Sequence, residues 1–134
     1  MADAIRPLEY DLMIFDYPPG VEYLERLGLV AANSTLVCTD AHPLAVMGAG
    51  RVLSELGLRK QKGRRGSQRW AIALSRIDLR RSMDQALDKQ LADAYPDVPR
   101  LMVHQDASLA WAGAERIPLM DYEASCRGGK DLKK

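Results

Sequence analysis

The chain has 134 residues, of which 47% are hydrophobic, so it is long enough to bury the core of one ordinary domain. Its 19 Lys and Arg residues nearly balance its 18 Asp and Glu residues, and the formal net charge of +1 argues against a protein held to nucleic acid by overall charge. Aromatic residues make up 6% of the chain, which argues against binding through rows of stacked rings, although a local basic patch remains open.

The cysteines and the apolar runs indicate the cellular compartment in which the protein is expected. Cys38 and Cys126 show neither a CxxC motif nor zinc-type spacing, so we expect two free thiols in a reducing environment. No apolar run reaches the roughly 20 residues that a membrane-spanning helix needs, and the acidic start at Asp3 is unlike a signal peptide. A cytoplasmic protein without a membrane span is expected.

In the first half of the chain, short apolar runs alternate with helical patterns. Residues 12–16 (LMIFD) predict a buried strand, which a Pro-Pro-Gly breaker closes. The apolar spacing over residues 21–32 predicts an amphipathic helix, and residues 35–39 predict a second buried strand. A further helix is expected over residues 43–56, stopped by Gly57.

The alternation continues after a basic, glycine-punctuated stretch at residues 59–69 (RKQKGRRGSQR), for which we expect a loop. The remaining predictions are strands over residues 70–74 and 101–103, helices over 80–94 and 108–115, an extended stretch over 118–122 and a frayed polar tail over 127–134.

Strands that are apolar on both faces and separated by single helices predict a mostly parallel sheet flanked by helices. We therefore expect an α/β fold that forms a single domain over residues 1–134, or part of a domain. Ligands of such sheets bind beyond the carboxyl ends of the strands, where Asp16 is expected. A carboxylate there can hold Mg²⁺, which prefers oxygen ligands. An Asp that only ends a strand or caps the next helix is the alternative.

The residues around Asp16 form a longer pattern. Residues 10–20 read YDLMIFDYPPG, in which Pro18 and Pro19 stiffen the turn and Gly20 lets the backbone approach a ligand. This order of residues resembles the Walker B segment of the ParA/MinD family of partition and positioning ATPases. Further segments resemble that family in the same order, namely residues 29–39, Ala45 with Gly48, residues 70–78, residues 103–122, and residues 127–132 at the start of the family's final helix.

The resemblance implies a P-loop NTPase-like fold with ATP and Mg²⁺ as cofactors. It implies that Asp16 is the Walker B acid, with roles in catalysis and in holding Mg²⁺, and that residues 18–20 are the second switch. It also implies that Ser75, Arg76 and Asp78 lie around the adenine base.

The family's phosphate-binding loop has no match in this sequence. That loop reads KGGxGKT, and its backbone amides and Lys hold the phosphates, but no GxxxxGK[ST] motif occurs here. The chain therefore resembles the C-terminal portion of such an ATPase and is not expected to hydrolyse ATP alone. In the family the Walker A strand is central and neighbours the Walker B strand. We therefore expect a homo-oligomer, a strand exchange or a rearranged sheet.

The basic stretch is the second candidate site. Contacts between several of its cations and DNA phosphates would give salt-sensitive binding without sequence preference, whereas a solvated loop that aids solubility is the alternative. His42 and His104 have no partners in the sequence, so we expect surface or strand-end roles for them. The candidate DNA contacts are Arg59, Lys60, Lys62, Arg64, Arg65 and Arg69.

Together these features predict a ParA-like protein of plasmid or chromosome partition that pairs with itself or with a full-length ParA-like partner and contacts DNA non-specifically. Two alternatives stay open. One is a non-catalytic regulatory or DNA- or partner-binding module, and the other is a truncated reading frame with no function of its own.

Overall fold

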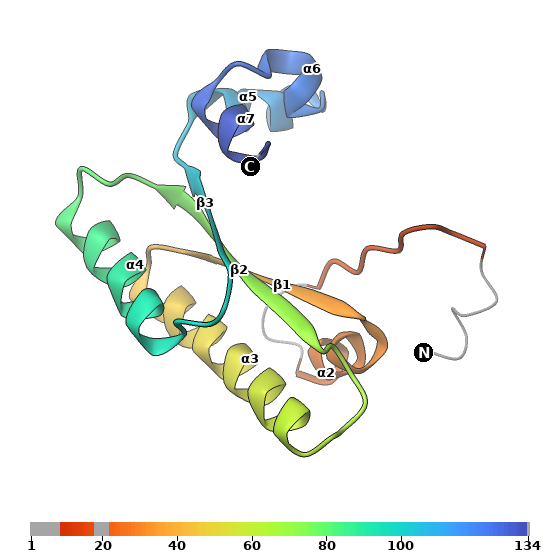
Figure 1. Cartoon of the computed structure of the whole chain (residues 1–134). Coiled ribbons are helices and arrows are strands. Elements are labelled where there is room, and N and C mark those ends of the chain that lie inside the picture. The colour runs from red at the N-terminus through yellow and green to blue at the C-terminus, as the bar shows by residue number, and fades with distance from the viewer. Residues whose placement is uncertain (1–8, 18–21, 134) are drawn as a thin grey trace. The chain divides into compact units, whose positions relative to one another are not determined.

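The computed structural model describes residues 9–17 and 22–133 (Figure 1). The chain forms two compact units: the first comprises the residues up to Thr35 together with Val52–Trp70, and the second comprises Leu36–Arg51 together with Ala71–Lys134. The expectation of one domain over residues 1–134 stays a prediction. Within the described ranges, no helix combines the length and the apolar character that crossing a membrane requires.

Three strands form the sheet: β1 (Ser34–Asp40), β2 (Arg69–Ile77) and β3 (Arg100–His104), in the order β1-β2-β3. β2 and β3 pair in parallel with Leu74 opposite Met102, and Figure 1 shows β1 running in the same direction. Parallel neighbours need a crossover connection, and here one helix connects β1 to β2 and a second helix connects β2 to β3. The predicted α/β class, with a mostly parallel sheet flanked by helices, is confirmed.

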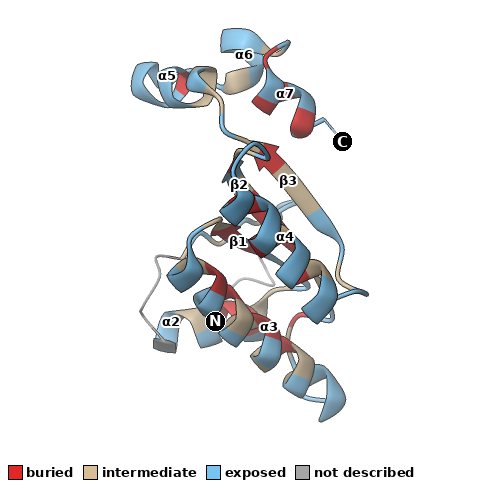
Figure 2. Cartoon of the chain, turned by 90° about the vertical axis from the view of Figure 1, so that its left-hand side faces the viewer, coloured by how far each residue is buried: buried red, intermediate tan, exposed pale blue. Residues whose placement is uncertain are grey.

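The crossover helices are α3 (Pro43–Gln61) and α4 (Ser82–Ala94). In the second unit, Leu87 and Leu91 of α4 are buried, as are the central residues of β2, whereas Figure 2 shows the outer surface of α4 exposed. The helical spacing that predicted this element is therefore explained by one apolar stripe turned toward the core.

The predicted buried strand over residues 12–16 is wrong. Residues 12–17 have no regular secondary structure, and within the described residues they pair with no strand. Leu12 and Ile14 are 76% and 80% exposed, and Asp16 is exposed as well. The physical reason is that an apolar run becomes a strand only where a neighbouring strand supplies partners for its backbone N–H and C=O groups.

The predicted strand over residues 35–39 is confirmed as β1, but its predicted burial on both faces is wrong. Val37 and Thr39 are buried, whereas Leu36 is 56% exposed and Cys38 is exposed. One face of β1 therefore lacks a covering layer within the described residues. Cys38 is a free thiol, and so is the buried Cys126, as the sequence predicted.

The third element, α3, does not stop at Gly57 as predicted. It continues to Gln61, so that Arg59 lies in its last turn instead of in a loop. A glycine inside a helix costs about 1 kcal/mol relative to alanine. Burial of Leu56 and the ion pair between Arg59 and Glu55, at 2.7 Å, offset this cost.

In the first unit, the predicted helix over residues 21–32 is confirmed as α2 (Glu22–Ala31). The turn before β2 docks on the end of this helix, because the Ser67 N–H donates to the Leu29 carbonyl at 2.9 Å. Gly66 has a φ of 140°, and a Cβ at this position would lie 2.6 Å from the same carbonyl oxygen. Only glycine fits this close approach without strain.

Three short helices, α5 (Ala107–Glu115), α6 (Leu119–Glu123) and α7 (Arg127–Asp131), follow β3. The prediction of an extended stretch at 118–122 is wrong, because the chain turns into α6 after Pro118, whose fixed φ suits a helix start. The prediction of a frayed tail is also wrong, whereas the helix implied there by the family resemblance is confirmed as α7.

Candidate functional site

Polar side chains gather at the carboxyl ends of β1 and β2, which are neighbours in the second unit. Parallel strands bring their carboxyl ends to the same edge of a sheet, and this edge is where α/β proteins bind ligands. Ser75, Arg76 and Asp78, which the resemblance places around an adenine base, all lie at this end of β2, and Arg76 contacts Asp40 of β1.

A bulge shapes the end of β2. The register of β2 against β3 shifts between Leu74 and Ile77, and Arg76 within this interval has a φ of 57°. A residue with a Cβ in this left-handed region carries strain of about 1 kcal/mol or more. Bulges re-aim side chains and are common beside active sites. Strain at this position therefore marks the end of β2 as a candidate site.

The bulged residues are held by β1. The Ser75 hydroxyl donates to the Thr39 carbonyl at 3.1 Å, and the Arg76 guanidinium forms an ion pair with the Asp40 carboxylate. The Arg76 side chain remains 73% exposed, so its charge faces solvent as well as Asp40. The other carboxylate oxygen of Asp40, Oδ1, is buried and has no hydrogen-bond partner within the described residues.

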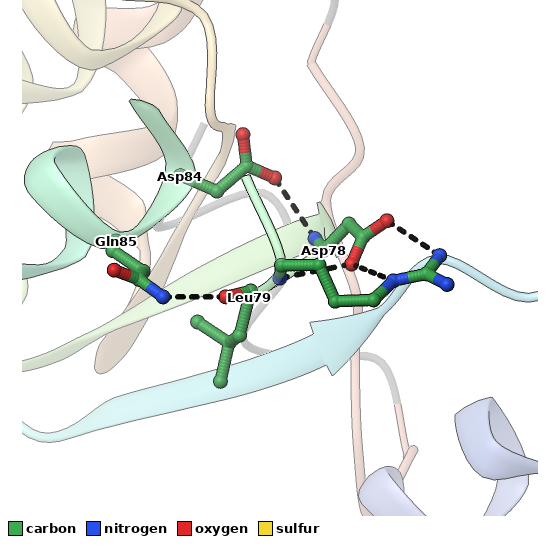
Figure 3. Close-up of polar contacts among 5 residues, drawn as sticks. Asp78, Leu79, Asp84 and Gln85 are labelled. Atoms are coloured by element: carbon green, nitrogen blue, oxygen red, sulfur yellow. Dashed lines mark hydrogen bonds and ion pairs between the residues drawn. The ribbon is translucent and has the colours of Figure 1, made fainter. Parts of the chain in front are cut away.

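Asp78 begins the turn that leads into α4 (Figure 3). Its Oδ1 accepts from the Arg80 backbone N–H at 3.1 Å and from Arg80 Nε at 2.9 Å, while Oδ2 accepts from Arg80 Nη2 at 2.8 Å. The side-chain and backbone hydrogen bonds from Arg80 hold the pKa of Asp78 well below its usual range. A carboxylate offers about four acceptor positions, so Oδ2 keeps roughly one for a further donor.

The same turn is fixed from the other side by α4. The Asp78 backbone N–H donates to Oδ2 of Asp84 at 2.8 Å, and Gln85 Nε2 donates to the Leu79 carbonyl at 2.6 Å (Figure 3). Asp84 is only 4% exposed, so its carboxylate depends on this hydrogen bond for compensation. Sequence reasoning missed Asp84, although an acidic residue in the first turn of a helix is a recognisable signal.

The end of β3 is anchored to α7 by a pair that sequence reasoning also missed. Oδ2 of Asp131 accepts from the His104 backbone N–H at 3.0 Å and lies 2.7 Å from His104 Nδ1. The side chains are 12% and 4% exposed, and His104 Nε2 is buried without a partner in the described part of the chain. No spacing rule links two residues this far apart.

Asp106 joins the same C-terminal helices. Its Oδ1 caps α5 by accepting from the Ser108 N–H at 2.9 Å, and its Oδ2 accepts from the Gly128 N–H at 3.0 Å. The hydrogen bond from Gly128, followed by that from Ser108, lowers the pKa of Asp106. This carboxylate therefore serves structure, and an Asp before a helical run is a sequence signal for such a cap.

Asp16, the predicted Walker B acid, lies in the first unit as an exposed side chain of the segment 12–17. The second-switch residues Pro18, Pro19 and Gly20 lie outside the described residues. No group of three or more His, Cys, Asp or Glu side chains that could hold a metal occurs in the described ranges. Asp16 alone therefore does not complete a Mg²⁺ site.

The basic stretch at residues 59–69, called the basic turn below, is only partly a loop. Arg59 belongs to α3 and Arg69 to β2, while Arg65 lies in the turn between them. Arg59 is engaged by Glu55 and donates to the Arg65 carbonyl at 3.5 Å, and Lys60 Nζ lies 5.3 Å from the centroid of the Trp70 ring. Three exposed cations of the basic turn have side chains that form no hydrogen bond or ion pair with another described residue: Lys62, Arg64 and Arg69.

Comparison with known proteins supports the fold class described above. Residues 3–67 match a family model described as an AAA domain, and this match together with the parallel sheet is consistent with a P-loop NTPase-like fold. The chain is similar to the chromosome-partitioning ATPase Soj of Treponema pallidum (strain Nichols), with 26% identity over 127 residues and 93% of this chain. It spans 50% of the length of that protein. The chain is thus distantly similar to a chromosome-partitioning ATPase.

Proposed function

We propose that the chain is a ParA-like protein of plasmid or chromosome partition, acting in the cytoplasm, with a nucleotide site that keeps its base side and lacks its phosphate side. The observation that carries this proposal is the bulged end of β2, where Ser75, Arg76 and Asp78 occupy the ligand-binding edge of a parallel sheet. The similarity to a chromosome-partitioning ATPase supports the partition role.

In this proposal the turn at Asp78 meets the base, because Oδ2 retains room for one amino donor. Asp16 is the Walker B carboxylate, and residues 18–20 are the second switch. When bound, Mg-ATP would supply the phosphoryl group for transfer. The described residues offer it one exposed carboxylate and no glycine-rich cradle, so they do not fit the whole group. The chain therefore does not hydrolyse ATP alone.

The basic turn is proposed to contact DNA phosphates without sequence preference. Its free cations are long, exposed side chains: Lys62 and Arg64 lie between α3 and β2, and Arg69 is the first residue of β2, so together they can follow a phosphate backbone. The partner is a second copy of this chain or a full-length ParA-like protein, because Leu12, Ile14 and one face of β1 are exposed within the described residues.

A second candidate function is a non-catalytic regulatory module. One observation favours it: Arg76 is already paired with Asp40, and the Ser75 hydroxyl is already used by β1. A base would then compete with contacts inside the protein, and the edge of the sheet would serve as structure only.

Calorimetric titration with adenosine and with Mg-ATP tests these proposals. We expect both ligands to bind weakly and with similar affinity, because the phosphates meet no dedicated amides. Asp78→Asn should weaken the binding of both ligands, because it removes the carboxylate acceptor and loosens the Arg80 guanidinium that the carboxylate holds. The control Asp93→Asn, at an exposed position of α4, should change the affinity for neither ligand. Micromolar binding of Mg-ATP would overturn the incomplete site, and failure of both ligands to bind would favour the regulatory module.

A further inference from the structure

In the described part of the chain, β1 has one edge that no strand covers. β1 lies at the end of the order β1-β2-β3, so one row of its backbone N–H and C=O groups faces no described strand. Natural edge strands are usually blunted by Lys, Pro, bulges or covering loops. The sequence of β1, STLVCTD, contains neither Lys nor Pro, and Leu36 and Cys38 are exposed on one face. Such an edge accepts another strand.

The same chain carries an unpaired segment of matching character. Residues 12–16 follow a drawn-out course in Figure 1, and exposure alternates along them. Leu12 and Ile14 are 76% and 80% exposed, whereas Met13 and Phe15 are partly buried. This period of two is the period of a β-strand, and four consecutive large apolar residues suit a strand buried on both faces. The described structure gives this segment no strand partner.

We propose that residues 12–16 of a second copy of this chain add to the free edge of β1 as a fourth, parallel strand. Among the described residues, each copy offers one segment and one strand edge that pair with no strand, so a reciprocal exchange satisfies both and closes with two-fold symmetry. The proposal rests on the oligomeric part of the proposed function and goes further by naming the segment, the edge and the direction.

Parallel addition is favoured because the other strands of the sheet are parallel and purely parallel sheets are over-represented. It has a consequence for the candidate site. The carboxyl end of the added strand lies beside the carboxyl end of β1, so Asp16 of the second copy reaches the edge that holds Asp40 and Arg76. The exposed guanidinium of Arg76 has enough N–H donors to hydrogen-bond both carboxylates, although its single positive charge balances only one of them. The site at the end of the sheet is thus assembled from both copies.

Cross-linking to the native Cys38 tests the pairing. In a Cys126→Ser background, which keeps an N-cap acceptor for α7, single cysteines are placed at Leu12, Met13, Ile14 and Phe15 and oxidised with copper–phenanthroline. Side chains on one face of adjacent strands are close enough for a disulfide, and those on the opposite face are not. In the register that places position 16 opposite position 40, Ile14 lies opposite Cys38. We therefore expect covalent dimers chiefly at position 14, weaker linkage at position 12 on the same face, and none at positions 13 and 15.

Other patterns overturn the proposal. Equal linkage at all four positions would indicate loose association, absence of linkage would exclude pairing, and an internal disulfide in a monomer would exclude the second copy. The direction of the added strand is tested with pairs of introduced cysteines in a Cys38→Ala background. Parallel addition predicts a disulfide between position 16 of one copy and position 40 of the other. A link from position 16 to position 34 would overturn the parallel arrangement and the contribution of Asp16.

Light scattering separates this proposal from oligomerisation in general. Ile14→Pro should reduce the dimer association constant by at least about tenfold, because proline removes a ladder donor in each of two symmetric strands. Ile14→Val is the matched control and should leave the dimer intact. A dimer that persists in Ile14→Pro without cross-links would refute strand addition alone, whereas a monomer at all concentrations would refute the oligomer as well.

Discussion

Replacing the free cations of the basic turn by Gln should remove most of the salt dependence of DNA binding. Lys62, Arg64 and Arg69 are exposed and, in the described part of the chain, their side chains pair with no other group. Each phosphate contact contributes about −0.9 to the slope of log K against log salt, so three contacts predict a slope near −2.7. Between about 50 and 200 mM salt, this slope corresponds to a roughly 40-fold loss of affinity.

The assay is fluorescence anisotropy of a labelled duplex of arbitrary sequence across a salt series. The matched control replaces Lys89, Arg127 and Lys130, three exposed cations outside the basic turn, by Gln. Both triple variants change the formal net charge from +1 to −2, since three positive charges are removed from +1. We expect a slope near zero for the basic-turn variant and the wild-type slope for the control. An equal change in both variants, or a change in neither, would refute the reasoning.

Three further predictions concern stability. Asp131→Ala should cost about 2–4 kcal/mol of unfolding free energy in urea, because the buried His104 N–H and ring lose a charged acceptor, and an intact midpoint would contradict this. The pKa of Asp106 is lowered in the folded state, so its ionised carboxylate stabilises the fold at pH values above the unfolded pKa of about 3.9. This stabilisation is lost as the pH falls from that value through the lowered pKa of the folded state. In Asp106→Asn the melting temperature should therefore fall less steeply with decreasing pH than in the wild type. Gly66→Ala should destabilise the chain by about 2 kcal/mol or more, since it adds a clash to backbone strain, whereas Gly63→Ala, with open space around it, should cost only about 1 kcal/mol.

Local patterns in the sequence predicted most helices and strands because those elements follow from local spacing. The apolar stripe of α4 is an example, since the burial of Leu87 and Leu91 follows from the helical spacing of nearby apolar residues. The continuation of α3 beyond Gly57 was missed because the burial of Leu56, together with the weaker i, i+4 ion pair between Glu55 and Arg59, offsets the cost of one glycine. The ion pair is a local signal, but the burial of Leu56 depends on packing that local spacing does not show.

Other features were not predictable because they depend on distant partners. Residues 12–16 carry the pattern of a buried strand, yet strand formation needs a neighbouring strand that the described residues do not provide. The order of α7 depends on Asp131, which meets His104 across 27 positions of the chain. The strained φ of Arg76 likewise leaves no mark in the sequence, because a bulge follows from pairing register.

Two acidic residues organise the β2–α4 turn in different ways: Asp78 lies in the turn, and Asp84 lies in the first turn of α4. Asp84 is buried and fixes the Asp78 backbone, while Gln85 fixes Leu79, so the turn is held in place without a ligand. A site that is already ordered loses little conformational entropy on binding. The Asp78 carboxylate stays ionised through its bonds to Arg80 and keeps an acceptor position open. In the proposed site, the base side is therefore organised before a nucleotide arrives, and the phosphate side limits the affinity.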